Sequence, residues 1–136
     1  MVKEMDFNEN KLINQTYEND WLIEETYRQS DFHQCHFNNI TTQDIVFENC
    51  YFYQTVFNQC DLSQAVFQDT TMNKTKYKEC RMIQTSFIHA PLKNVDLSTC
   101  LIEAIEATPQ DVSGAIIDEM QASAFIHLLN IKIKEA

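Results

Sequence analysis

The sequence is poor in the residues that break or loosen a chain. One glycine and two prolines occur among 136 residues, which is too few for a disordered or low-complexity chain. A long apolar run is also missing, because the longest, residues 124–131, contains His127 and Asn130 and is far too short to span a bilayer. The first residues, MVKEMDFNENK, hold no apolar signal segment. We therefore expect a single domain over residues 1–136, without a membrane span, in the cytoplasm.

Basic residues are scarce as well. Ten lysines and arginines stand against 20 aspartates and glutamates, and the formal net charge is -10 at pH 7. Proteins bind nucleic acids largely through lysine and arginine on the phosphates, so this balance argues against a nucleic-acid partner. It permits a protein partner with a basic surface.

The dominant pattern in the sequence has a period of five residues. Every fifth position from Phe7 to Ile117 is apolar, with Thr42 as the one exception, and eight of the nine phenylalanines fall in this register. A second register, from Ser30 to Ala115, holds small or β-branched residues except at Gln110. The period fits neither a helix at 3.6 residues nor a strand at two. It requires a chain that turns a corner every five residues and sends one large and one small side chain inward on each side.

Two pentads, Cys60–Gln64 and Val95–Thr99, match the motif small–Asp/Asn–Leu/Phe–x–x of the pentapeptide-repeat family, which the chain resembles over most of its length. The resemblance implies an all-β solenoid, a right-handed quadrilateral β-helix in which four sides close a coil of 20 residues. Residues 7 to 117 would give about 5.5 coils, and coils stacked roughly 4.8 Å apart would make a rod of roughly 26 Å. Stacking would bury apolar residues that a single coil cannot bury. Residues 30–117 are expected to form the regular part.

The first coil departs from the pattern. Its large register holds, but polar residues occupy the small one: Asn10, Gln15, Asp20 and Glu25. We therefore expect residues 1–29 to form an irregular or capping first coil. A polar cap would keep the open edge strands from pairing with another molecule.

The sequence changes character again after Ile117. Asp118 can N-cap a helix, and residues 119–129 favour one, so residues 118–136 are expected to form a short C-terminal α-helix and a tail. The helix has more apolar residues than a cap over one coil needs. Two uses therefore stay open, capping the core and joining two copies of the chain. The residues expected at such a dimer contact are Met120, Ala124, Phe125, Leu128 and Leu129.

The segment 111–123 resembles the C-terminal end of the Qnr-type quinolone-resistance proteins. The matching residues are Asp111, Gly114, Asp118, Gln121, Ala122 and Ser123. The resemblance implies a homodimer through the C-terminal helix, and a β-helix that occupies the DNA-binding saddle of DNA gyrase or topoisomerase IV. The chain is shorter than the resistance proteins and lacks the loops that interrupt their coils, which the family links to protection from quinolones. Gyrase binding or inhibition is therefore expected in preference to a role in quinolone resistance.

The five cysteines all fall in the small inward register. Cys60, Cys80 and Cys100 are 20 residues apart and should form a ladder on one inner side. A linear ladder cannot give tetrahedral zinc geometry, and parallel Cβ directions disfavour a disulfide, so we expect buried free thiols. Spacing places no Cys–His or Ser–His–Asp set, and an interior filled by side chains leaves no ligand pocket. We expect no catalytic residue, no cofactor and no metal site.

Charge can be assigned to sides of the rod, because residues 20 apart should stack. One flank consists of the residues whose numbers leave a remainder of 3 to 9 on division by 20. It contains ten acidic residues and only two basic ones, Lys3 and Arg28. The side with remainders 11 to 19, up to residue 117, holds five acids and five bases. Nearly all of the excess negative charge therefore lies along one flank. The residues expected to contact a partner there are Glu24, Asp44, Glu48 and Asp69.

An acidic flank can be a solvated face, or it can imitate DNA. Duplex DNA would carry about 15 charges over roughly 26 Å, so a net eight on one flank is a sparse imitation that a head-to-head dimer would lengthen. With the resemblance, we expect a non-catalytic DNA mimic that binds DNA gyrase or topoisomerase IV. The alternative is a protein–protein interaction scaffold with an unassigned partner.

Overall fold

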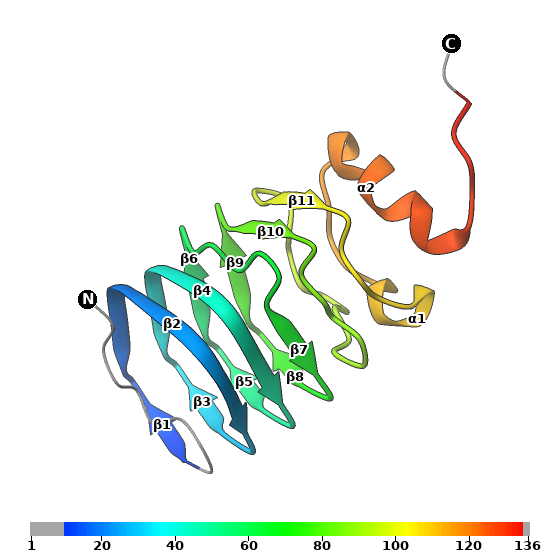
Figure 1. Ribbon diagram of the computed structural model, residues 1–136. Coiled ribbons are helices and arrows are strands. Elements are labelled where there is room, and N and C mark those ends of the chain that lie inside the picture. Colours follow the sequence, from blue (N-terminus) through cyan, green and yellow to red (C-terminus); the bar gives the residue numbers. More distant parts are fainter. Residues whose placement is uncertain (1–9, 135–136) are drawn as a thin grey trace.

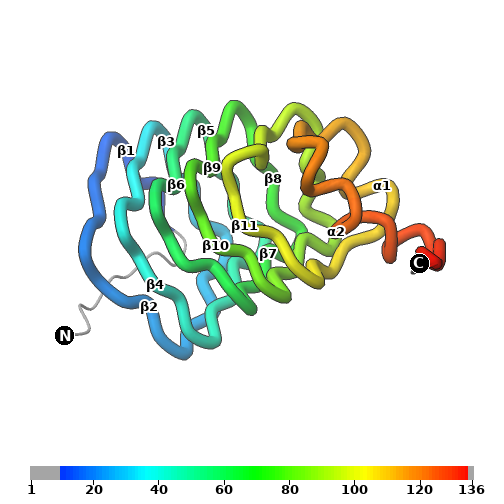
Figure 2. The backbone as a smooth tube through the Cα atoms, turned by 90° about the horizontal axis from the view of Figure 1, so that it is seen from above, coloured from blue at the N-terminus to red at the C-terminus, as the bar shows by residue number. Residues whose placement is uncertain are grey.

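The computed structural model describes residues 10–134. The chain winds in stacked coils from the N-terminal to the C-terminal end, and a helical segment covers the last coil (Figures 1 and 2). The strands are β1 (Lys11–Ile13), β2 (Thr16–Arg28), β3 (Asp31–His33), β4 (His36–Glu48), β5 (Tyr51–Tyr53), β6 (Val56–Asn58), β7 (Val66–Gln68), β8 (Thr71–Asn73), β9 (Lys76–Lys78), β10 (Arg81–Ile83) and β11 (Leu101–Glu103). The helices are α1 (Pro109–Val112), the 3-10 helix η1 (Glu119–Gln121), α2 (Ser123–Ile126) and the 3-10 helix η2 (His127–Leu129).

Every strand pair is parallel and joins residues 20 apart, as in Phe32↔Phe52 and Phe37↔Phe57. The strands form one sheet of order β1-β3-β5-β8, one of order β2-β4-β6-β9 with β7 also on β4, and the pair β10-β11. The fold is therefore the expected right-handed quadrilateral β-helix of about five coils. The prediction from the five-residue period is confirmed.

Corners of the coil are made by residues in the left-handed conformation. A positive φ recurs at every fifth residue from Asn14 to Asn94, for example 54° at Gln29 and 56° at Asp44. L-residues with a Cβ enter this region at a cost, and β-branched ones are outliers there. Accordingly, unbranched polar side chains fill the corners, and no Val, Ile or Thr is among the positive-φ residues of the described chain.

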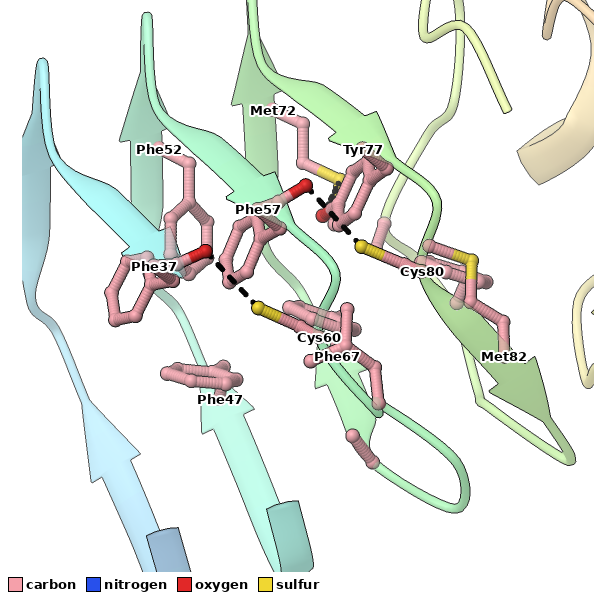
Figure 3. Packing of buried hydrophobic residues seen from close by; sticks show 14 of the residues in the cluster. Phe37, Phe47, Phe52, Phe57, Cys60, Phe67, Met72, Tyr77, Cys80 and Met82 are labelled. Carbon is pink, nitrogen blue, oxygen red and sulfur yellow. Dashed lines mark hydrogen bonds between the residues drawn. The ribbon is translucent and has the colours of Figure 1, made fainter. Parts of the chain in front are cut away.

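The large inward residues stack in columns along the axis. Phe37, Phe57 and Tyr77 form one column, with ring centroids 4.7 and 4.9 Å apart and nearly parallel planes. Neighbouring columns meet edge to face, as between Phe52 and Phe57 at 5.5 Å (Figure 3). Offset-stacked and edge-to-face geometries are the favourable ones for aromatic rings. The aromatic register is therefore the core.

The small inward residues tie successive coils together through side-chain hydrogen bonds. Thr55 Oγ1 donates to the Phe32 carbonyl at 3.1 Å, and Cys60 Sγ donates to the Phe37 carbonyl at 3.1 Å (Figure 3). In the same way, Thr75 Oγ1 donates to the Phe52 carbonyl. Each of these acceptors lies 23 residues earlier in the chain, so one side chain bridges two coils. No buried side-chain nitrogen or oxygen between residues 10 and 134 lacks a partner.

The first coil is more regular than expected. Between residues 10 and 29, β1 and β2 pair in register with β3 and β4, and Asn14, Asn19, Glu24 and Gln29 take the corner conformation. The expectation of an irregular coil is wrong for these residues. Their polar side chains at small positions, such as Gln15 and Glu25, are exposed at the open end of the stack and do not disturb the backbone. Residues 1–9, including Phe7, lie outside the described residues.

At the other end, two capping boxes start the helical segments. Asp118 accepts from the Met120 N–H at 2.8 Å, and Gln121 Oε1 accepts from the Asp118 N–H at 2.7 Å. Asp118 is thus the N-cap that the sequence predicts. The expected continuous helix over 119–129 is divided into η1, α2 and η2, which agrees with the frequent 3-10 turns at helix ends. The second capping box, formed by Thr108 and the buried Asp111 at the start of α1, was not predicted from the sequence.

Candidate protein-binding surfaces

The acidic flank is the surface formed by Glu24, Asp44, Glu48 and Asp69. Glu24 and Asp44 are exposed at successive levels of one corner, as the register Ile23↔Gln43 and Glu25↔Ile45 requires. Asp69 is exposed at the next corner, and Glu48 ends β4 between the two corners. The structure therefore brings the four carboxylates that the sequence singled out to one side of the rod, over its first three coils.

Two of these carboxylates have a basic partner within the chain. Arg28 Nε donates to Glu48 Oε2 at 2.8 Å, across one level of the stack. His89 Nδ1 lies 3.4 Å from Asp69 Oδ1, also one coil away, and this contact is an ion pair only when His89 is protonated. Among the described residues these are the two salt bridges of the acidic flank. Glu24 and Asp44 form no salt bridge with any of the described residues.

Neutral residues separate the acids on this side. Val46 pairs with Val66 across β4 and β7, and Gln64 and Gln84 continue the corner of Asp44 with a hydrogen bond of 3.0 Å between their amides. Described residues with remainders of 3 to 9 comprise seven acids and Arg28, a net charge of minus six. The remaining charges counted from the sequence, at residues 3–9, lie outside the described residues. The flank is a sparse row of carboxylates rather than a continuous strip.

A second candidate surface lies at the C-terminal end. The five residues predicted to join two copies divide into two groups. Ala124, Phe125 and Leu128 pack against the core of the last coil. Met120 and Leu129 are exposed, with 89% and 54% of their surface accessible, and Ile131 and Ile133, which follow η2 in the chain, are exposed as well. The segment therefore caps the core with one side and leaves an apolar side uncovered.

Side chains of this segment also satisfy the open edge of the last coil. Gln121 Nε2 donates to the carbonyls of Leu97 and Cys100 at 2.9 and 2.7 Å. His127 Nε2 lies 3.1 Å from the Ile105 carbonyl. In a further coil, backbone N–H groups would reach the Cys100 and Ile105 carbonyls, as the Leu101 N–H reaches the Cys80 carbonyl. Side chains of the terminal segment thus take the place of the hydrogen-bond donors that a further coil would supply. The spacing of residues in the sequence did not predict this role.

The cysteines form the expected inward ladder. All five are buried and free, and Cys80 Sγ and Cys100 Sγ donate to the carbonyls of Phe57 and Tyr77. Burial raises the pKa of the Cys35 and Cys50 thiols, and it raises the pKa of the fully enclosed Tyr77 phenol well above its usual range. The neutral thiols of Cys35 and Cys50 are therefore poor nucleophiles and poor metal ligands.

Residues 10–134 contain no group of three or more His, Cys, Asp or Glu side chains placed to hold a metal ion. Within the same stretch, no helix has the length and apolar character needed to cross a membrane.

Comparisons with known proteins agree with the fold. A solved structure of the pentapeptide repeat protein Rfr23, from the cyanobacterium Cyanothece 51142, is 12% identical over 82% of this chain and 88% of that chain, with a TM-score of 0.66. Full-length QnrB1, a plasmid-mediated fluoroquinolone resistance protein, is 14% identical over 92% of each chain, with a TM-score of only 0.26. No curated protein sequence matches the chain.

The pentapeptide repeat region, as a sequence family, matches residues 30–107. These residues contain most of the aromatic columns, the corner series and the ladder of cysteines and threonines. Because the match spans more than half of the chain and coincides with the coils that the structure shows, the protein belongs to the pentapeptide-repeat family.

Proposed function

We propose that this protein is a non-catalytic DNA mimic whose acidic flank binds DNA gyrase or topoisomerase IV. The observation that carries the proposal is the grouping of Glu24, Asp44, Glu48 and Asp69 on one side of a rigid rod. A surface that receives the phosphates of DNA is positively charged, and a rod with one acidic side is complementary to it. The resemblance of residues 111–123 to the Qnr-type proteins names the partner.

The direct test is a binding measurement between the full chain and the gyrase holoenzyme at several salt concentrations. We expect a submicromolar complex that weakens as salt increases and that duplex DNA displaces. A supercoiling assay with and without a quinolone then separates inhibition from protection. Absence of binding at low salt would remove the proposal.

The protein would act as a homodimer through its exposed C-terminal apolar side. Exposed Met120 and Leu129, together with Ile131 and Ile133, form more apolar surface than a monomer end requires. Joining two ends would also lengthen the acidic row. Light scattering is expected to give twice the chain mass, and Met120→Glu is expected to give one chain mass, whereas Met72→Leu in the core leaves the dimer intact. A monomer at all concentrations would contradict the dimer.

An interaction scaffold with another partner is the second candidate. One observation favours it: Glu48 and Asp69 are engaged by Arg28 and His89, which reduces the free negative charge of the flank. Capture of a partner that is not a topoisomerase, on the wild-type chain but not on a Glu24→Gln/Asp44→Asn variant, would assign the flank to that partner.

A further inference from the structure

The side of the rod opposite the acidic flank carries a row of lysines. Lys74 stands at a corner, and Lys76 and Lys78 point outward from β9. In a coil of four five-residue sides, positions ten apart lie on opposite sides, so β9 lies opposite β7 of the acidic flank (Figure 1). All three lysines are exposed, and no carboxylate in residues 10–134 pairs with them within 4.0 Å. In a chain of net charge -10, this row is a local surplus of positive charge.

The lysine row borders two adjoining open hollows. Both hollows are lined by Lys76 and Asp96; one continues to Lys74 and Asn94, and the other to Lys78 and Glu79. Together they run along β9 from one corner of the coil to the next. The surface is therefore a shallow groove parallel to a strand, with cations along it and carboxylates at its border.

The carboxylates are fixed parts of the groove. Asp96 Oδ1 accepts from the Ser98 N–H at 2.9 Å, and hydrogen bonds from Ser98 hold the pKa of Asp96 below its usual value. Glu79 Oε2 accepts from Gln59 Nε2 at 3.2 Å. The sugar–phosphate backbone of DNA has no hydrogen-bond donors for such acceptors. A peptide brings both backbone N–H donors for the carboxylates and side-chain anions for the lysines.

The spacing also fits a peptide in extended form. Alternate residues of a strand lie roughly 6.6 Å apart, so Lys76 and Lys78 of β9 match carboxylates on alternate residues of an extended ligand, and Lys74 continues the row at the corner. We propose that this groove binds an acidic peptide segment of a partner protein, in extended conformation, with its carboxylates on the lysine row. Salt screens charge over roughly 8 Å, so these lysines act on the ligand more strongly than the flank on the far side does.

The test uses the full chain and a fluorescein-labelled heptapeptide in which glutamates alternate with serines, measured by fluorescence anisotropy at low salt. Lys76→Gln is expected to weaken binding about threefold, as for one exposed ion pair. The variant Lys74→Gln/Lys76→Gln/Lys78→Gln should abolish it. Lys11→Gln, the same charge change at an exposed site on β1, and a peptide with glutamines in place of glutamates are the controls.

Three results would overturn the proposal: an equal loss in Lys11→Gln, equal binding of the glutamine peptide, or tighter binding of a single-stranded oligonucleotide through the same lysines. The last result would assign the groove to nucleic acid. Self-association that the triple variant abolishes, without any peptide binding, would assign it to a second copy and also overturn the proposal. The double variant Glu24→Gln/Asp44→Asn should leave peptide binding unchanged, so this groove and the proposed gyrase-binding flank are tested separately.

Discussion

Corner residues limit which side chains the coil accepts at every fifth position. Gln29 has a φ of 54° and an exposed side chain, whereas Gln68 is exposed on β7 with strand geometry. We expect Gln29→Val to lower the free energy of unfolding by about 1–2 kcal/mol, because a β-branched residue in the left-handed region is strained. Gln68→Val, on a strand where valine is favoured, should change it little. Chemical denaturation measures both, and equal effects would contradict the role of the corners.

The Cys35 and Cys50 thiols and the Tyr77 phenol make stability sensitive to alkaline pH. Burial raises the pKa of Cys35 and Cys50 above the ordinary 9.0, and that of Tyr77 above 10.0. A group whose pKa is raised in the folded state retains its proton there and loses it first in the unfolded chain. Its contribution is therefore complete below the unfolded pKa and is lost as pH rises toward the folded pKa. The free energy of unfolding should fall from about pH 9 upward.

A matched variant for this prediction is Cys50→Thr. Thr70 occupies the next level of the same column and makes the same bond, from its Oγ1 to the Phe47 carbonyl at 3.2 Å, as Cys50 makes to the Tyr27 carbonyl. Urea denaturation at pH 7, 9 and 10.5 should show a smaller alkaline loss in the variant than in the wild type. Constant stability across this range would count against the pKa shifts.

At the scale of elements, the C-terminal segment is held by the Gln121 side chain. Its Nε2 donates to two carbonyls of the last coil, and its Oε1 accepts from the Asp118 N–H. Gln121→Ala leaves the Cys100 carbonyl and the Asp118 N–H without these partners, and we expect a loss of about 2 kcal/mol in the free energy of unfolding. Gln110→Ala, at an exposed position of α1, is the control and should have little effect. Faster amide hydrogen exchange at Phe125 and Leu128 in Gln121→Ala alone would locate the loss in this segment.

Regular elements could be predicted from the sequence, and irregular ones only in part. Phe52 and Phe57 belong to the large five-residue register and Cys60 to the small one. Both registers follow from burial alone, and they were sufficient to predict a coiled chain with corners. The first coil was misjudged because polar residues at small positions disrupt packing only where another coil covers them, and none of the described residues covers Gln15. The break of the terminal helix depends on contacts with Leu97 and Cys100 that are remote in sequence.

At the scale of the whole molecule, the candidate surfaces could likewise be predicted only in part from the sequence. The 20-residue coil was enough to place Glu24, Asp44, Glu48 and Asp69 on one side. It could not show that Arg28 and His89 engage two of them, because this depends on side-chain rotamers across coils. The charge count for the opposite side sums to zero, so it did not reveal the lysine row of β9. Glu79 and Asp96 beside the row and three acids elsewhere on that side balance its bases. The rod is thus polarised across its width as well as acidic in total.

Placement of charge, rather than its total, is the central claim, and one pair of variants tests it. Glu24→Gln/Asp44→Asn removes two negative charges from the acidic flank, and Glu18→Gln/Asp31→Asn removes two from other sides of the same coils. The measurement is the dissociation constant of each variant and of the wild type for the gyrase holoenzyme at one salt concentration. We expect the flank variant to bind about tenfold more weakly, at roughly 0.5–1 kcal/mol per charge, and the other variant to bind like the wild type. Equal weakening of both variants would contradict the claim.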